Sequence, residues 1–160
     1  MKLGLALREL HRSEVDLARE LLQVSERHAA EHGVFHVARD LAQWSVGHVT
    51  VIAHVARDFD EDLDPHPRLE DGVVGRLRER GSDLVGRRGE VALLLLRDLR
   101  SIYTKASGVS VDWELLAQGA QGARDRELLE VAERCHPDTL RQARWANGML
   151  KESATQILLS

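Results

Sequence analysis

The sequence of 160 residues has little of what marks secreted, disulfide-bonded and membrane proteins. Its one cysteine, Cys135, has no partner in the chain for a disulfide, which favours a reducing compartment such as the cytoplasm. The longest apolar run is 91–96, whereas a helix that crosses a bilayer needs about 20 apolar residues. No N-terminal stretch combines a basic segment, an apolar core and a small-residue cleavage site, so we expect no secretion signal. These absences predict a cytoplasmic protein that does not enter a membrane.

Clustered positive charge is scarce as well. The net charge is −4, and residues of both signs are interleaved along the chain. The nearest basic groups, within 76–80 and at 87–88, lie in a stretch that also holds acidic residues. Because a nucleic-acid-binding surface needs concentrated Lys and Arg, this pattern argues against a nucleic-acid partner.

Helical periodicity covers most of the chain. Apolar residues recur at steps of three and four, β-branched runs are short, there are only three prolines, and strand-like alternation over a useful length is absent. The sequence therefore predicts an all-α fold in one domain, residues 1–160, whose length suffices for a buried core. The predicted helices cover about 3–30, 34–59, 89–123 and 125–156.

Glycine and proline predict where these helices end. Gly33 is expected to close the first helix in the left-handed conformation. The second helix is expected to stop before Pro65 and Pro67. Pro137 removes a backbone hydrogen bond inside the fourth pattern, and it disfavours helical geometry at the residue before it. We therefore expect a kink or a break at His136.

The stretch 60–84 is polar, rich in Gly and Pro, and weakly patterned. It is long enough to run the length of a helical bundle, about 40 Å for a helix of about 27 residues. A short helix over 72–80 is one option within it. We interpret 60–84 as a single long crossover between the second and third helices.

Two polar residues interrupt the apolar stripes at matching depths. Glu14 occupies a stripe position in the first helix, and His48 occupies one in the second. A turn is expected around Glu31, and Glu14 lies as far before that residue as His48 lies after it. If the two helices are antiparallel, a carboxylate and an imidazole meet at one level inside the bundle. This pair is the main functional lead in the sequence.

Two helices, one long crossover and two further helices, with polar residues in the seam, resemble the ferritin-like superfamily. The resemblance covers essentially the whole chain, and topology carries more of it than motif does. The sequence from 127 to 133 and onward looks like the last helix of small uncharacterised bacterial members. The resemblance implies a four-helix bundle that is related to di-iron proteins.

The di-iron site of that family uses a Glu from each of two helices and a Glu-x-x-His from each of the other two. By this resemblance, Glu14 matches the first-helix Glu, and His48 matches the His of the first Glu-x-x-His. Ser45 stands where the family has the Glu of that motif, and a hydroxyl cannot bridge two metals as a carboxylate does. Glu133 and His136 have the spacing of the second motif. The resemblance therefore implies a site in which several ligands are missing.

Further departures concern the third and fourth helices. No seam position of the third helix carries a carboxylate, because Asp98 lies one residue off the face. Pro137 follows His136 directly and can turn its side chain away. A single divalent ion, iron or zinc, held by Glu14, His48 and His136 is still chemically acceptable. The other interpretation is a buried hydrogen-bonded pair of Glu14 and His48, with no cofactor.

The remaining conspicuous residues have simpler interpretations. His28, His32 and His36 are expected to be solvated at one end of the bundle, and Trp113 to pack in the core. Cys135 is expected to be a small core residue. No nucleophile elbow, phosphate loop or Cys-x-x-Cys motif is present, so the sequence identifies no catalytic residues.

Two functions remain open at this level. The first is a ferritin-like bundle with an incomplete metal site, a non-catalytic binding or scaffold protein that self-associates as a homo-oligomer. A different protein partner is an option within this class. The second is a metalloprotein that holds one ion at Glu14 and His48, with oxidase-like or metal-storage activity. The sequence does not decide whether the protein is an enzyme.

Overall fold

The computed structural model describes residues 2–69 and 88–160. These residues form α-helices and one short 3-10 helix and contain no strand, so the predicted all-α fold class is confirmed. The elements are α1 (Leu3–Arg27), α2 (His32–Ala56), η1 (Arg57–Phe59), α4 (Arg88–Ala123) and α5 (Arg126–Leu159). No helix in the described ranges is both long enough and apolar enough to span a bilayer.

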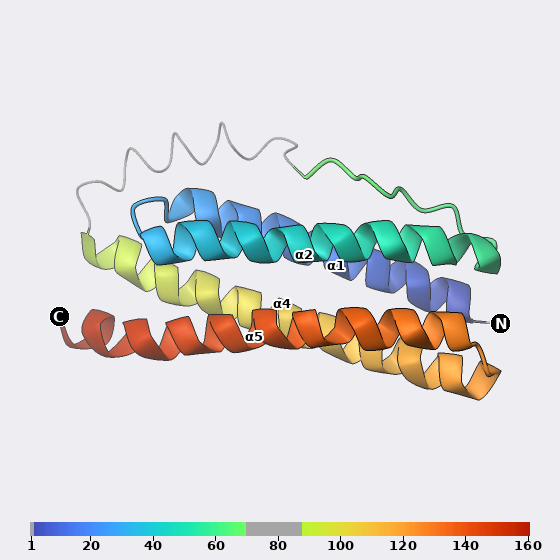
Figure 1. The fold of residues 1–160 in the computed structure, drawn as a ribbon. Coiled ribbons are helices and arrows are strands. Elements are labelled where there is room, and N and C mark those ends of the chain that lie inside the picture. The colour runs from blue at the N-terminus through green and yellow to red at the C-terminus, as the bar shows by residue number, and fades with distance from the viewer. Residues whose placement is uncertain (1, 70–87) are drawn as a thin grey trace.

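The helices form two antiparallel hairpins, α1–α2 and α4–α5, that lie against each other (Figure 1). Trp113 of α4 contacts Glu14 of α1, and Asp98 of α4 contacts Arg27 of α1, so these two helices are antiparallel. It follows that α2 and α4 run in the same direction. The chain between α2 and α4 therefore joins opposite ends of the bundle.

Residues 60–69 run back along the first hairpin. Arg8, near the start of α1, donates two hydrogen bonds to the carboxylate of Glu61. Arg19, three turns further along α1, donates to the backbone carbonyl of Arg68. The segment therefore follows α1 in the same direction as the helix.

The rest of the predicted crossover at 60–84, with the short helix considered over 72–80, lies outside the described residues. The basic groups at 76–80 and at 87 also lie outside them. The described part of the chain thus shows the two ends of the connection, which leaves α2 at one end of the bundle and enters α4 at the other.

The core is built by the apolar stripes that the helical periodicity predicted. Complete burial of a Leu or Ile side chain contributes about 1.5–3 kcal/mol, so this set supplies most of the driving force for packing the hairpins together. The largest fully buried apolar side chains are Leu7, Leu10, Leu17, Leu21, Ile52, Leu99, Ile102, Trp113, Leu116 and Leu128.

The first turn differs from the prediction at Gly33. Helix α1 ends at Arg27 and α2 already begins at His32, so Gly33 lies inside α2 and is not left-handed. The chain reverses before it, where the N–H of Glu31 donates to the carbonyl of His28. Glycine permits the left-handed conformation but does not require it, and this hydrogen-bonded turn closes without it. The left-handed residue between α4 and α5 is Arg124, with φ of 58°.

Pro137 lies within α5, which is one helix from Arg126 to Leu159. Of the kink or break predicted at His136, the break is therefore wrong. The proline ring lies on the exposed face, and its missing N–H removes only the bond to the carbonyl of Glu133. Cys135 and Thr139 are buried on either side of it and hold the helix against the bundle. Tertiary packing here outweighs the local preference of proline.

Replacing Pro137 with Ala should stabilise the protein. The substitution restores the helical N–H at an exposed position, and proline is less favourable than Ala by about 3 kcal/mol in a helix interior. We expect the free energy of unfolding in urea, followed by circular dichroism, to rise by up to about 3 kcal/mol.

The matched control is Gly148→Ala, at a position of the same helix where an added Cβ meets nothing within 4 Å. Its expected gain is smaller, about 1 kcal/mol. A loss of stability in Pro137→Ala would show that the proline is required for the shape of α5.

Candidate functional site

Glu14 and His48 meet inside the bundle, at the level that their spacing from the turn predicts. Nδ1 of His48 lies 2.7 Å from Oε1 of Glu14. Glu14 is fully buried, and His48 is 5% exposed. Buried leucines one turn away on either side of Glu14 fix its direction, because the whole stripe of α1 must face the core. The apolar pattern therefore positions the carboxylate, and the turn at 28–31 sets the level of the imidazole.

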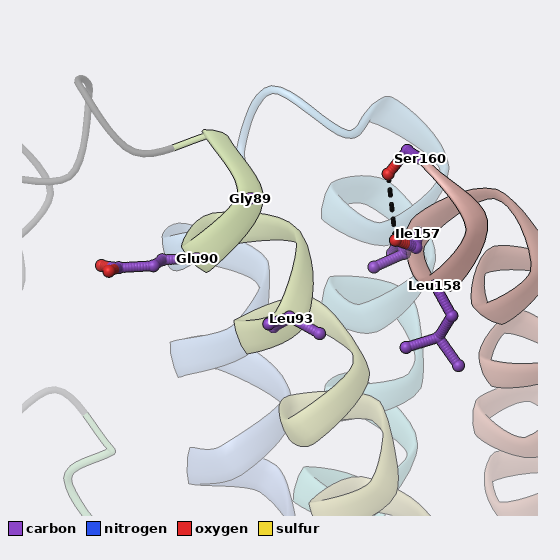
Figure 2. A pocket seen from close by; sticks show the side chains of 6 residues that line it. All are labelled: Gly89, Glu90, Leu93, Ile157, Leu158 and Ser160. Atoms are coloured by element: carbon purple, nitrogen blue, oxygen red, sulfur yellow. Dashed lines mark hydrogen bonds between the residues drawn. The ribbon is translucent and has the colours of Figure 1, made fainter.

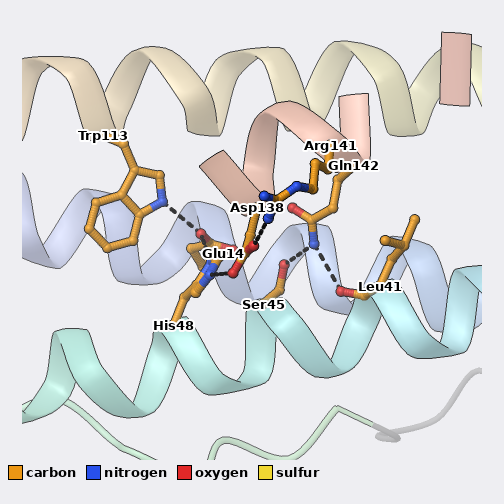
Figure 3. A network of polar contacts seen from close by, with 8 residues as sticks. All are labelled: Glu14, Leu41, Ser45, His48, Trp113, Asp138, Arg141 and Gln142. Atoms are coloured by element: carbon orange, nitrogen blue, oxygen red, sulfur yellow. Dashed lines mark hydrogen bonds and ion pairs between the residues drawn. The ribbon is translucent and has the colours of Figure 1, made fainter. Parts of the chain in front are cut away.

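The pair belongs to a network that reaches all four long helices (Figure 3). The indole N–H of Trp113 on α4 donates to the same Glu14 oxygen at 2.8 Å. On the other side, Nε2 of His48 lies 3.2 Å from Oδ2 of Asp138 on α5. Asp138 also accepts a hydrogen bond from Arg141 at 2.7 Å. The network thus joins α1, α2, α4 and α5 at one level of the bundle.

The imidazole of His48 lies between two carboxylates, one at each ring nitrogen. Burial lowers the pKa of His48, but the hydrogen bond and negative charge of Glu14, and then those of Asp138, outweigh it and raise the pKa above its ordinary value. A cationic ring donates from both nitrogens. When the ring is protonated, each of its N–H groups therefore faces a carboxylate oxygen.

A second set of polar contacts joins α5 to α2 one turn further along. The side-chain amide of Gln142 donates to the backbone carbonyl of Leu41 and to the hydroxyl of Ser45, both at 2.9 Å. Ser45, Gln142 and His48 are all buried. The position at which the ferritin-like motif has a Glu is therefore occupied by a hydroxyl that accepts from another side chain.

Three buried oxygens near this level have no hydrogen-bond partner among the described groups. They are Oε2 of Glu14, Oγ1 of Thr139 and Oε1 of Gln142. Thr139 and Gln142 lie one turn apart on α5, on the face that packs into the bundle. Leaving a polar atom buried without a hydrogen bond costs about 1–3 kcal/mol. The hydrogen-bonding capacity of the polar groups at this level is therefore only partly used, although both nitrogens of His48 have partners.

His136, the third residue of the predicted metal site, does not join Glu14 and His48. Its Nε2 lies 2.8 Å from Oγ of Ser110, and 3.7 Å from Oε1 of Glu114, on the side where α5 packs against α4. Asp138, two residues further along α5, is the residue that reaches His48. The helical phase of α5 therefore separates the two side chains, and the structure brings together two of the three predicted residues.

The contact between Ser110 and His136 resembles a nucleophile with its base, but it lacks the rest of a hydrolytic site. In a triad, an acidic group orients the imidazole through the nitrogen that does not face the nucleophile. Here Glu114 approaches the same nitrogen as Ser110. Both residues also lie within long helices, where backbone N–H groups are used in helical hydrogen bonds and cannot form an oxyanion hole.

The side chains around His48 do not offer converging lone pairs to a metal ion. Both of its ring nitrogens face protein carboxylates, Ser45 accepts from Gln142, and Asp138 is paired with Arg141. In residues 2–69 and 88–160, no group of three or more His, Cys, Asp or Glu side chains is arranged to hold a metal. The donor set therefore does not fit the di-iron centre of the ferritin-like family.

A second buried charge cluster lies near the turn of the first hairpin. The carboxylate of Asp98 accepts two hydrogen bonds from Arg27, at 2.6 and 2.7 Å, and lies 2.7 Å from Nε2 of His28. The expectation of a solvated His28 is wrong, because His28 follows Val24 by four residues and so continues the buried stripe of α1, and its N–H still donates to the carbonyl of Val24. His32 and His36 are exposed, as predicted.

Cys135 is buried on α5, three residues before Asp138. Burial raises the pKa of its thiol to about 11, with smaller opposing effects from Arg134 and reinforcing ones from Glu14 and Asp138. Because the thiolate is the reactive form, this residue is an inert core side chain at neutral pH.

Comparison with known proteins places this geometry in no family. No protein-family model matches the chain, and neither does any curated protein or solved structure. Function is therefore inferred from the side chains of this chain alone.

Removing either member of the central pair should lower the free energy of unfolding, and the two losses should not add when both members are removed. In each single variant, Glu14→Leu or His48→Leu, the remaining member loses its buried partner, and breaking a buried pair in this way costs about 3–5 kcal/mol. The double variant Glu14→Leu with His48→Leu removes both charges and keeps the volume filled. We expect its loss, measured by urea unfolding, to be smaller than the sum of the two single losses. Additive losses would show that the two residues are not energetically coupled.

The raised pKa of His48 predicts how stability depends on pH. A group whose pKa is higher in the folded state stabilises the fold fully below its unfolded pKa of about 6.5, and this contribution is lost as the pH rises through the folded pKa. We expect the stability difference between the natural protein and His48→Gln to shrink as the pH rises above about 6.5. Urea titrations at several pH values measure it. A difference that grows with pH would mean that the buried ring is neutral.

Proposed function

We propose that the protein is a ferritin-like helical bundle without catalytic activity, which self-associates and acts as a binding or scaffold protein. One observation carries the proposal: both ring nitrogens of His48, the best candidate ligand, are engaged by carboxylates of the same chain. A side chain that is saturated in this way fixes the positions of helices and has no free site for a substrate or an ion.

The direction of the helices supports the ferritin-like assignment. Since α2 and α4 run the same way, one connection must return along the whole bundle, and a single long crossover is the connectivity of ferritin-like folds. The described residues 60–69 begin such a return along α1. Polar residues occupy the positions where ferritin-like proteins have metal ligands, but here Glu14 bonds to His48, and Ser45 bonds to Gln142.

Two hollows on the described part of the surface lie away from the charged network. One of about 460 Å³ lies where α4 begins and α5 ends, beside Leu93, Ile157 and Leu158 (Figure 2). Another, of about 130 Å³, lies against α2 near His66 and Pro67. Neither is lined by Glu14 or His48. This arrangement favours interaction through the outer surface over chemistry in the interior.

Exposed apolar residues support the self-association. On α4 alone, Leu93, Tyr103, Val111 and Leu115 are all exposed, although the opposite face of this helix already lies in the core. Single exposed apolar side chains are ordinary, whereas contiguous ones mark contact surfaces, and Val111 and Leu115 lie one turn apart.

The alternative function is a metalloprotein that holds one ion at Glu14 and His48. The observation in its favour is the buried Oε2 of Glu14, which has no partner among the described groups and could bind an ion. Binding through His48 would then require the ring to lose a proton and to give up Glu14 or Asp138.

Metal analysis of protein purified from its native host tests these functions against each other. We expect metal at well below one ion per chain after dialysis, and an unfolding temperature that does not change with a chelator. The control is Glu14→Gln, which should leave the metal content as it is. Stoichiometric iron or zinc that is lost in Glu14→Gln would overturn the non-catalytic proposal in favour of the metalloprotein.

A further inference from the structure

The outward face of α4 carries an uncharged stripe. Its positions Thr104, Gly108, Val111 and Leu115 follow steps of four, three and four, the period of the buried face of the same helix. Val111 is 51% exposed and Leu115 is 64% exposed. Thr104 and Gly108 are exposed as well. Helix α4 therefore has an apolar face in the core and, on the surface, an uncharged stripe in which Val111 and Leu115 are the apolar members.

Among the described residues, Gly108 has no packing role, as is also true of Gly47 and Gly148. A Cβ at this position would meet nothing within 4 Å, so no described neighbour requires the absence of a side chain. Glycine in the interior of a helix nevertheless costs about 1 kcal/mol relative to Ala. Close approach of another backbone is a standard reason for glycine. A helix from outside the chain that crosses α4 here would provide that reason.

The two edges of the stripe carry complementary groups. Lys105 and Asp112 lie two turns apart on the edge nearer α1, where Lys105 is 3.9 Å from Glu20. Tyr103 and Glu114 lie three turns apart on the edge nearer α5, where Glu114 approaches His136. The midpoint between residues 105 and 112 falls beside Gly108, and so does the midpoint between residues 103 and 114. Both edges are therefore symmetric about the same point of the helix.

This symmetry is what an antiparallel pair of identical helices requires. A two-fold axis between two such helices brings the same edge of each copy together and pairs positions that are equally distant from the axis. With the axis at Gly108, the ammonium of Lys105 faces the carboxylate of Asp112 in the second copy. On the other edge, the phenol of Tyr103 faces Glu114. Val111 and Leu115 of each copy then lie next to Thr104 and Gly108 of the other, large side chains against small ones.

We infer that a second copy of this chain docks on α4 in antiparallel orientation, with the two-fold axis at Gly108. The inference rests on the self-association proposed above and gives it a location. The contact spans about 14 residues, or about 20 Å of helix. It buries less than the roughly 800 Å² per partner of a standard interface, so the dimer is weak. Sedimentation should be measured up to concentrations on the order of 500 μM.

Exchange of the edge charges tests this pairing. Lys105→Glu places two acidic groups opposite each other at both symmetric contacts, and Asp112→Lys places two basic groups there. Each single variant should raise the dissociation constant of the dimer about tenfold. The double variant Lys105→Glu with Asp112→Lys restores opposite charges and should return the constant to its natural value. The matched control is Lys151→Glu, an equal change of charge on an exposed residue of α5, which should have no effect.

Cross-linking gives an independent readout of the axis. In a Cys135→Ala background, Gly108→Cys places a thiol at the two-fold axis, and mild oxidation should join two chains because the two cysteines lie within disulfide reach. Gly148→Cys is the matched control, since a Cβ there also meets open space and the residue lies away from the stripe. We expect it to remain uncross-linked. Circular dichroism confirms that each variant is folded.

The outcomes separate this interface from self-association in general. Loss of the dimer in the single variants, recovery in the double variant and cross-linking only through residue 108 support the inference. An oligomer that ignores the charge exchange and does not cross-link through residue 108 overturns the interface and leaves self-association standing. A monomer at every concentration overturns both.

Discussion

The buried, hydrogen-bonded pair of Glu14 and His48 is the constraint on which the arrangement of the helices depends. A charge inside a bundle is tolerated only when it is paired and hydrogen-bonded. Glu14 obtains its partners from α2 and α4, and His48 obtains its own from α1 and α5. Sliding any one helix by a turn would break at least one hydrogen bond of this buried network. The network therefore selects one axial alignment of helices whose apolar stripes alone would permit several.

The cluster at Asp98 sets a second level of the same alignment. Along α1, Arg27 lies 13 residues beyond Glu14, which is about 20 Å of helix. Both Glu14 and Arg27 bond to α4, through Trp113 and Asp98. Two fixed points on one helix pair determine its translation and limit its tilt. Buried ion pairs of this kind add little net stability compared with apolar packing, so their main contribution is to specify register.

The sequence predicted the features that hydrophobic periodicity determines, and it did not predict the polar contacts between helices that are distant in sequence. Hydrophobic periodicity determines which helices form and which faces they bury, so the four helices and the meeting of Glu14 with His48 were predictable. Trp113 was interpreted only as core, because an apolar stripe does not show where an indole N–H points. The partnership of Asp138 with His48 was missed because α5 continues through Pro137 and keeps its helical phase. Such contacts depend on the relative placement of helices that are distant in sequence.

The separation of the contacts along the chain has a consequence for the order of folding. Glu14 and His48 belong to one hairpin and lie 34 residues apart, whereas Trp113 is 99 residues from Glu14 and Asp138 is 90 residues from His48. Contacts that are close in sequence form faster than distant ones. The first hairpin can thus bring its two charges together in water, before the second hairpin arrives. In this order of events, the docking of α4 and α5 is the step that removes water from the pair and adds Trp113 and Asp138 to it.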